Sequence, residues 1–350
     1  MNYSTLDKFE GAWFGSIIGS ALANKLDSSD YNKILNYEDR DWIEIRNKIA
    51  LVVLQNRHKR EIQRELESLL ENYFYDLLNS YQNASNQAST LFEQIPKTDL
   101  INCYCRLMSF LLPLTILQQD NNYVENIYIK AITRSNLNFV STESIPQDIA
   151  AWNHILTMAL NSKFMFTEAN VAIAIRQILS LIKVKKSSLV EKLKIVSQAW
   201  ENGLSLQQLI SKLYRHENSV EKTIPTASLA IALSFYCFAS TPKNFVVSVK
   251  RAARIDNNLS PSVALLTATL SGAYNGRTSL PKNWIRAAHR HPSDLLARKT
   301  VQKLYQIWSG VYDLDNLKLL CNSEATTIAA PKIFQTRSSL KIISQKSTLD

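Results

Sequence analysis

The sequence is poor in the residues that interrupt helices. Only seven glycines and nine prolines occur among 350 residues, and no proline precedes Pro96 or lies between Pro146 and Pro225. Glycine weakens a helix through its backbone freedom and proline removes a backbone donor, so their scarcity favours long uninterrupted helices. No stretch shows a sustained alternation of apolar and polar residues, so a β-sheet is not expected. The sequence therefore predicts an all-α protein.

Cysteine is scarce as well. The four cysteines are too few and too irregularly spaced for a disulfide framework or a paired metal-binding motif. They are Cys103, Cys105, Cys237 and Cys321. This usage fits a reducing compartment, and we expect a cytoplasmic protein.

Long hydrophobic runs are also missing. The longest apolar stretch, residues 226–241, contains several hydroxyl residues and is shorter than the roughly 20 residues that cross a bilayer. Residues 12–23 look like the apolar part of a signal peptide, but Asp7, Lys8 and Glu10 give them no basic leader. We therefore expect two buried helices and no membrane span.

Apolar residues recur with helical spacing over much of the chain. Residues 43–81 carry isoleucine, valine, leucine and phenylalanine at intervals of three, four and seven, and residues 168–182, 189–200 and 205–215 continue the pattern. Gly203 is a plausible stop between two of these helices. No repeat and no linker precede residue 320, so we expect one helical domain over residues 1–320. Residues 321–350 form a basic tail with serine and threonine, expected to be loosely ordered.

The charge balance is basic, with a formal net charge of +10 and an isoelectric point near 9.3. A polyanionic partner would suit this charge, but the cations are dispersed in short groups at residues 57–60, 183–186, 250–254 and 286–290. Each group fits a solvated helix face. No interleaved aromatic residues or known nucleic-acid module accompany them, so nucleic acid is not the expected partner.

The few glycines gather in two strips of small residues. Gly11, Gly15 and Gly19 recur every four residues and therefore lie on one side of a helix. Residues 262–276 repeat the theme with Gly272 and Gly276 among alanines and serines. A helix without side chains on one side admits another backbone at close range, so we expect these two helices to pack closely near the centre of the fold.

Three segments occur in an order that is typical of one protein family. Residues 10–23 (EGAWFGSIIGSALA) are similar to that family's glycine-rich first helix, and residues 102–117 (NCYCRLMSFLLPLTIL) to its middle segment. Residues 224–285 carry the clearest likeness through GAYNG, Leu280, Pro281 and Trp284. Over roughly residues 8–300 the chain thus resembles the ADP-ribosylglycohydrolases. The resemblance implies an orthogonal multi-helix bundle, in which two magnesium-type ions hydrolyse the glycosidic bond between ADP-ribose and a protein side chain or small molecule.

The resemblance also implies where metal ligands should lie, and this chain departs from the family there. The family's Asp-x-Asp-Thr falls on Leu259, Ser260, Pro261 and Ser262, and Ser20 replaces the aspartate of its Gly-Asp-Ala-Leu-Gly. Hard divalent cations bind several carboxylate oxygens, which leucine and proline side chains cannot supply. We therefore expect no metal cofactor.

Two functional interpretations are open at this point. In the first, the chain is a catalytically degenerate member, a pseudoenzyme, that binds a protein partner or a nucleotide-like ligand in the central cleft as a binding or regulatory module. In the alternative, it is an active hydrolase with Mg²⁺ that uses Glu38, Asp39, Asp41 and Asp256. The family's Thr-Asp-Asp-Thr corresponds here to residues 38–41, where the cationic Arg40 intervenes. Acids in a first helical turn also have an ordinary explanation in the helix dipole.

Overall fold

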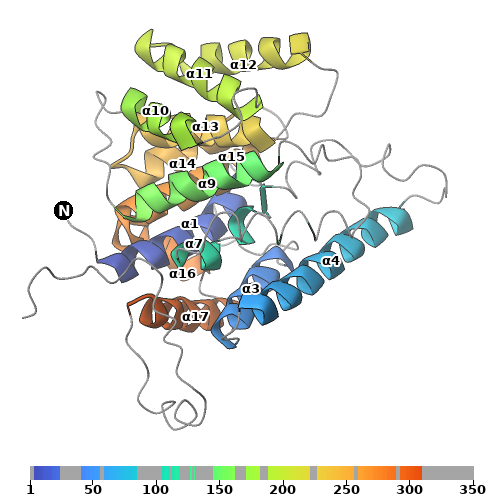
Figure 1. The fold of residues 1–350 in the computed structure, drawn as a ribbon. Helices are drawn as coiled ribbons and strands as arrows, with labels where there is room; N and C mark the ends of the chain where they lie inside the picture. The colour runs from blue at the N-terminus through green and yellow to red at the C-terminus, as the bar shows by residue number, and fades with distance from the viewer. Residues whose placement is uncertain are drawn as a thin grey trace, which may run out of the picture.

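The structure, a computed structural model, consists of packed helices (Figure 1). It describes residues 4–23, 41–55, 59–84, 105–106, 108–110, 112–117, 127, 130, 145–161, 171–181, 188–220, 227–255, 259–288 and 292–309. No residue in these ranges belongs to a β-strand, which confirms the all-α prediction. None of the helices described there has both the length and the hydropathy needed to cross a membrane.

The helices are named here in chain order, with the labels of Figure 1. They are α1 (Thr5–Ala23), α3 (Asp41–Gln55), α4 (Lys59–Ala84), α7 (Leu112–Ile116), α9 (Ile145–Leu160), α10 (Val171–Leu181), α11 (Ser188–Glu201), α12 (Leu206–Val220), α13 (Ala227–Ser240), α14 (Phe245–Ala253), α15 (Ser260–Asn275), the 3-10 turn η2 (Arg277–Ser279), α16 (Lys282–Ala288) and α17 (Pro292–Ser309). The predicted tail at residues 321–350 lies outside the described residues.

Helices α1 and α15 form the centre of the bundle. Residues 8–22 of α1 are all buried, and so is nearly all of α15. Helices α9, α13 and α14 pack against α15, while α16 and α17 contact α1. Figure 1 shows α9 and α13 on one side of α1, with α3, α16 and α17 on the other. The two small-residue strips of the sequence therefore lie at the core of the fold, as predicted.

The two central helices run antiparallel at very short range. A Cβ atom added to Gly11 would lie within 3.0 Å of the Gly272 carbonyl oxygen, and one added to Gly15 would lie as close to the Ala268 oxygen. The same holds for Gly19 and Ala264. Each step of four residues forward along α1 is thus a step of four residues backward along α15. The close approach predicted from the glycine spacing is confirmed.

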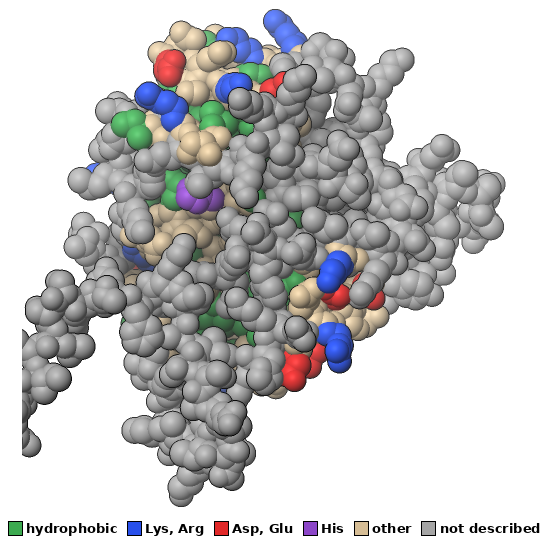
Figure 2. Space-filling model, viewed as in Figure 1, with side chains coloured by type: hydrophobic (Ala, Val, Ile, Leu, Met, Phe, Trp, Pro, Cys, Tyr) green, Lys and Arg blue, Asp and Glu red, His purple; other side chains and the backbone are tan. Residues whose placement is uncertain are grey.

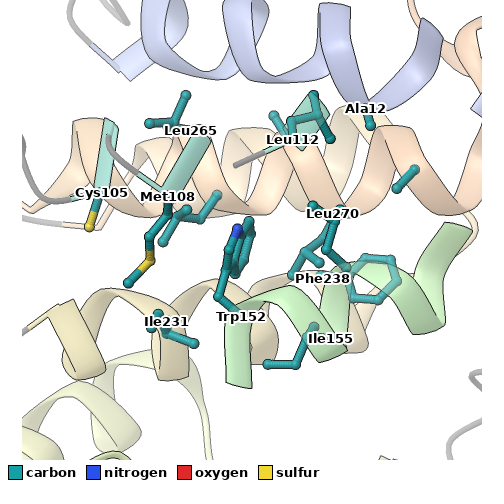
Figure 3. Close-up of a cluster of buried hydrophobic side chains, with 14 of the residues drawn as sticks. Ala12, Cys105, Met108, Leu112, Trp152, Ile155, Ile231, Phe238, Leu265 and Leu270 are labelled. Carbon is teal, nitrogen blue, oxygen red and sulfur yellow. The ribbon is translucent and has the colours of Figure 1, made fainter. Parts of the chain in front are cut away.

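A second layer of the core joins α9 and α13 to α15. Figure 3 shows Trp152 of α9 among side chains that include Met108, Ile231 of α13 and Leu265 of α15. Trp152 is fully buried, and burying a large apolar side chain of this kind contributes roughly 1.5–3 kcal/mol. The contacts of α9 therefore hold it firmly against the central helices.

The outer layer consists of α10, α11 and α12. Gly203 has φ of 60° and lies between α11 and α12, so it ends α11 as predicted from the sequence. The Tyr236 hydroxyl of α13 donates to the Leu204 carbonyl oxygen at 2.7 Å, and its ring lies edge-on to Trp200. This side chain anchors the α11–α12 turn to the core.

Buried charges fix the amino-terminal end of α1. Lys8 is 5% exposed and its Nζ donates to the carbonyl oxygen of Leu160, the last residue of α9, at 3.2 Å. Burial lowers the pKa of Lys8, while the negative end of the α9 dipole favours a cation at this position. Glu10, also 5% exposed, pairs with Arg277 at 3.2 Å and with Arg298 at 3.6 Å. These contacts join α1 to α9, η2 and α17.

We expect Glu10→Gln to lower the free energy of unfolding by about 1–2 kcal/mol, because it removes the negative charge that faces two arginines. The loss should stay below the roughly 3–5 kcal/mol typical of a fully buried pair, since the Arg298 side chain is 47% exposed. Urea denaturation would measure it, with the exposed Glu44→Gln on α3 as the control. Equal urea midpoints for both variants would contradict this role of Glu10.

Candidate functional site

The positions that the family resemblance marks as metal ligands meet at one end of the central pair. Because α1 and α15 are antiparallel, the last turn of α1 lies beside the first turn of α15. Ser20 is therefore placed near residues 259–262, although the two segments are about 240 residues apart in sequence. Ser20, Leu259 and Ser262 are all buried, with exposed fractions of 6%, 3% and 1%. Ser20 and the first turn of α15 thus lie at the same end of the central pair.

Helices α9 and α13 also begin at this end of the bundle. The Thr267 hydroxyl of α15 lies 3.4 Å from the Ser234 carbonyl oxygen of α13, and Asn275 donates to the Pro242 carbonyl oxygen at 2.6 Å. Both contacts join residues 33 apart, so α13 and α15 are parallel and begin at the same level. Helix α9 ends beside Lys8 and therefore runs opposite to α1 (Figure 1). The amino termini of α9, α13 and α15 thus gather near the carboxyl end of α1.

The first turn of α15 is closed by local contacts. The Ser260 hydroxyl donates to the Ala253 carbonyl oxygen at 2.8 Å, which ties the start of α15 to the end of α14. Leu259 occupies the N-cap position and forms no side-chain cap, and Pro261 follows in the first turn. Proline suits that turn because its missing N–H would have no partner within the helix. Among the described residues, the first turn of α15 therefore presents no carboxylate.

The described groups at this end are poor ligands for a divalent cation. They are serine hydroxyls, a leucine, a proline, a single buried carboxyl at Asp148 and three helix amino termini, whose dipoles disfavour positive charge. Among the residues that the structure describes, no three His, Cys, Asp or Glu side chains gather in a way that could hold a metal ion. The Mg²⁺ that the family resemblance implies does not fit these residues.

The acidic candidates fall where the structure gives no side-chain positions. Glu38, Asp39 and Asp256 lie outside the described residues. Asp41 is the first residue of α3, and its side chain is likewise not described. The hypothesis that these four carboxylates form an altered metal site therefore stays a prediction.

One buried carboxylate at this end was not predicted from the sequence. Asp148, in the first turn of α9, accepts hydrogen bonds from the Ser228 hydroxyl of α13 at 2.8 and 3.0 Å. Burial raises the pKa of Asp148 to about 7, although the Ser228 hydrogen bond and the charge of Lys192 oppose the rise. Only the packing of α9, α11 and α13 creates this environment. In the sequence, an acid just after Pro146 simply fits the start of a helix.

A comparison with known protein families finds a match in the part of the chain that forms the carboxyl-terminal helices. The model of the ADP-ribosylglycohydrolase family matches residues 144–313, just under half of the chain. Over this segment the chain is similar to the ADP-ribosylglycohydrolases. It runs from α9 through α17 and contains the first turn of α15, so the resemblance seen in residues 224–285 is confirmed. A comparison with curated proteins finds no match.

The matched segment does not include α1, which belongs to the preceding part of the chain. Even so, α1 packs along the whole of α15, so the two regions share one core. The family match and the contacts together define the candidate site as the junction of the last turn of α1 with the first turns of α9, α13 and α15.

Proposed function

We propose that this chain retains the ADP-ribosylglycohydrolase architecture without two-metal hydrolysis and acts as a binding or regulatory module. The observation that supports the proposal is the first turn of α15, where Leu259 and Pro261 stand in place of two family aspartates. Two divalent ions a few ångströms apart repel each other strongly, and a surplus of carboxylates is needed to hold them together. The described side chains at this end supply one buried carboxyl, Asp148, whose pKa is about 7.

The helix amino termini and serine hydroxyls at this end of the bundle suit an anion better than a cation. Helix amino termini carry partial positive charge and free N–H donors, and serine hydroxyls can donate to phosphate oxygens. We therefore propose that the ligand is nucleotide-like or, failing that, a protein partner that covers the same end of the bundle. Cys105 and Cys237 are buried and form no disulfide, which fits the proposed cytoplasmic location.

The direct test is metal titration of the purified full chain followed by a glycohydrolase assay. We expect no Mg²⁺ or Mn²⁺ binding tighter than about 0.1 mM, and no metal-dependent release of ADP-ribose from modified arginine, modified serine or small-molecule substrates. An active hydrolase of the family, run in parallel, controls for the assay. Two-site metal binding below about 0.1 mM together with turnover would refute the proposal and favour a site built from Glu38, Asp39, Asp41 and Asp256.

A companion experiment tests whether the replacement of the family's metal-binding carboxylates explains the expected absence of metal binding. The triple variant Ser20→Asp, Leu259→Asp and Pro261→Asp should regain metal binding, seen as a rise in melting temperature when Mg²⁺ is added. Thermal unfolding also detects any loss of folding that follows from burying new carboxylates. The control carries Gln207→Asp and Ser211→Asp on the exposed face of α12 and should show no such rise. If Mg²⁺ changes the melting temperatures of both variants equally, positions 20, 259 and 261 are not where the metal ligands were lost.

Titration with ADP-ribose tests the nucleotide-like ligand separately. Saturable binding to the unmodified chain would support it, and the absence of binding would favour a protein partner at this end.

A further inference from the structure

The outer face of α14 carries a row of cations. Lys243 precedes the helix, Lys250 and Arg251 lie in its last turns, and Arg254 is its C-cap residue. Lys243 and Arg254 are exposed and the other two are partly exposed, whereas Phe245, Ser248, Val249, Ala252 and Ala253 face the core. Among the cations lies Val247, 40% exposed and one of the few large hydrophobic residues at the described surface. These five residues, the α14 row, form one continuous helix face.

The α14 row lies in a region of the chain with almost no negative charge. Residues 227–288 contain seven lysines and arginines, and their only acidic residue is Asp256, which lies outside the described residues. None of the four cations of the row forms an ion pair with a described residue. By contrast, Figure 2 shows side chains of both signs over α11 and α12. The positive charge of the row is therefore uncompensated by its described neighbours.

The carboxyl end of the α14 row lies beside the candidate site. Pro242, just before α14, accepts a hydrogen bond from Asn275 at the carboxyl end of α15, and Ala253 accepts one from Ser260 at its amino end. Helix α14 is thus antiparallel to α15, and Arg254 lies beside the first turn of α15. At 1.5 Å per residue, the row spans roughly 16 Å.

We propose that the α14 row binds an acidic peptide segment of a partner protein, with an apolar residue among its carboxylates. Charge complementarity over about 16 Å matches a few turns of helix or a short extended peptide, and Val247 offers the apolar contact. A nucleic-acid surface would be expected to present aromatic side chains for base stacking, and the exposed face of α14 has none. This interaction goes beyond the proposed function, because it does not depend on the fate of the metal ligands.

Fluorescence anisotropy with the full chain and a labelled peptide tests the proposal. The peptide has about twelve residues, mainly glutamate with leucine at regular intervals, and is long enough to cover the row. We expect saturable binding that weakens as salt is raised, and a loss of at least about tenfold in affinity for Lys250→Glu with Arg254→Glu. The control is Lys194→Glu with Lys212→Glu on the exposed faces of α11 and α12, which should stay within about twofold of the parent.

Three outcomes would overturn the proposal. The first is no binding by the folded parent, and the second is equal loss in both double variants. The third is tighter binding of duplex DNA or of vesicles containing phosphatidylserine than of the peptide, with the same sensitivity to Lys250 and Arg254. A matched peptide with serine in place of leucine should bind more weakly, and equal affinity would contradict the role of Val247.

Discussion

We expect Gly272→Leu and Gly15→Leu each to lower the free energy of unfolding by several kcal/mol. A loss of this size prevents stable folding of a protein whose total stability is low. A Cβ atom on Gly272 would overlap the carbonyl group of Gly11, and one on Gly15 would overlap that of Ala268. Both neighbours are backbone atoms of a central helix, so neither can move aside as a flexible side chain would. Relief requires α1 and α15 to separate, which opens the core along their whole contact.

Thermal and urea denaturation of Gly15→Leu and Gly272→Leu would measure this loss. The control is Gly203→Leu, because a side chain at Gly203 would have nothing within 4 Å. Its positive φ limits the expected cost to roughly 1–2 kcal/mol. If the variants at Gly15 and Gly272 unfold like the parent, the close approach of the two helices is not what these glycines provide.

Asp148 should make the stability of the protein fall as the pH rises through neutrality. Its carboxyl group has a pKa of about 7 in the folded state and an ordinary value of 3.8, so the folded state retains the proton over this range. The contribution to stability is full below about pH 4 and is lost as the pH rises through 7. A shift of about three pKa units corresponds to about 4 kcal/mol, and the amino-terminal dipole of α9 reduces this to about 3.

Asp148→Asn keeps the shape of the side chain and removes its ionisation. We expect this variant to lose much of the decline in unfolding free energy between pH 5 and pH 8, as measured by urea denaturation at each pH. Ser228→Ala should steepen the decline, because the Ser228 hydroxyl donates to the carboxylate and stabilises its charged form. The charge of Lys192 acts in the same direction as Ser228. If the unfolding free energies of the parent and Asp148→Asn depend on pH in the same way, Asp148 is not the source of the decline.

The family resemblance located the candidate site more sharply than the chemistry of single residues did. GAYNG and the residues after it are a local pattern, and counting back from them predicts Leu259 and Pro261 at the start of a helix, which is where α15 begins. The acidic candidates followed from weaker likenesses, and their geometry stays a prediction. Asp148 and Glu10 carried no local signal, because an acid near a helix start has the same appearance whether it is solvated or buried.

What the sequence alone determined was local in character. The scarcity of glycine and proline and the spacing of apolar residues specified helices, and the stop at Gly203 was predicted within its segment. The glycine spacing identified two helices able to approach closely, because that property depends on a few neighbouring residues. Periodicity shows which side of a helix is buried, but it does not show what lies against that side.

Only the tertiary structure decided which partners meet. It paired α1 with α15 in antiparallel register, joined Lys8 to Leu160 and Glu10 to Arg277, and placed Asp148 beside Ser228. These contacts link residues between about 80 and 270 positions apart. The physical reason is that a buried charge or polar group is stabilised by whichever groups the packing brings within hydrogen-bonding distance. That choice depends on how all the helices fit together, and no local pattern carries it.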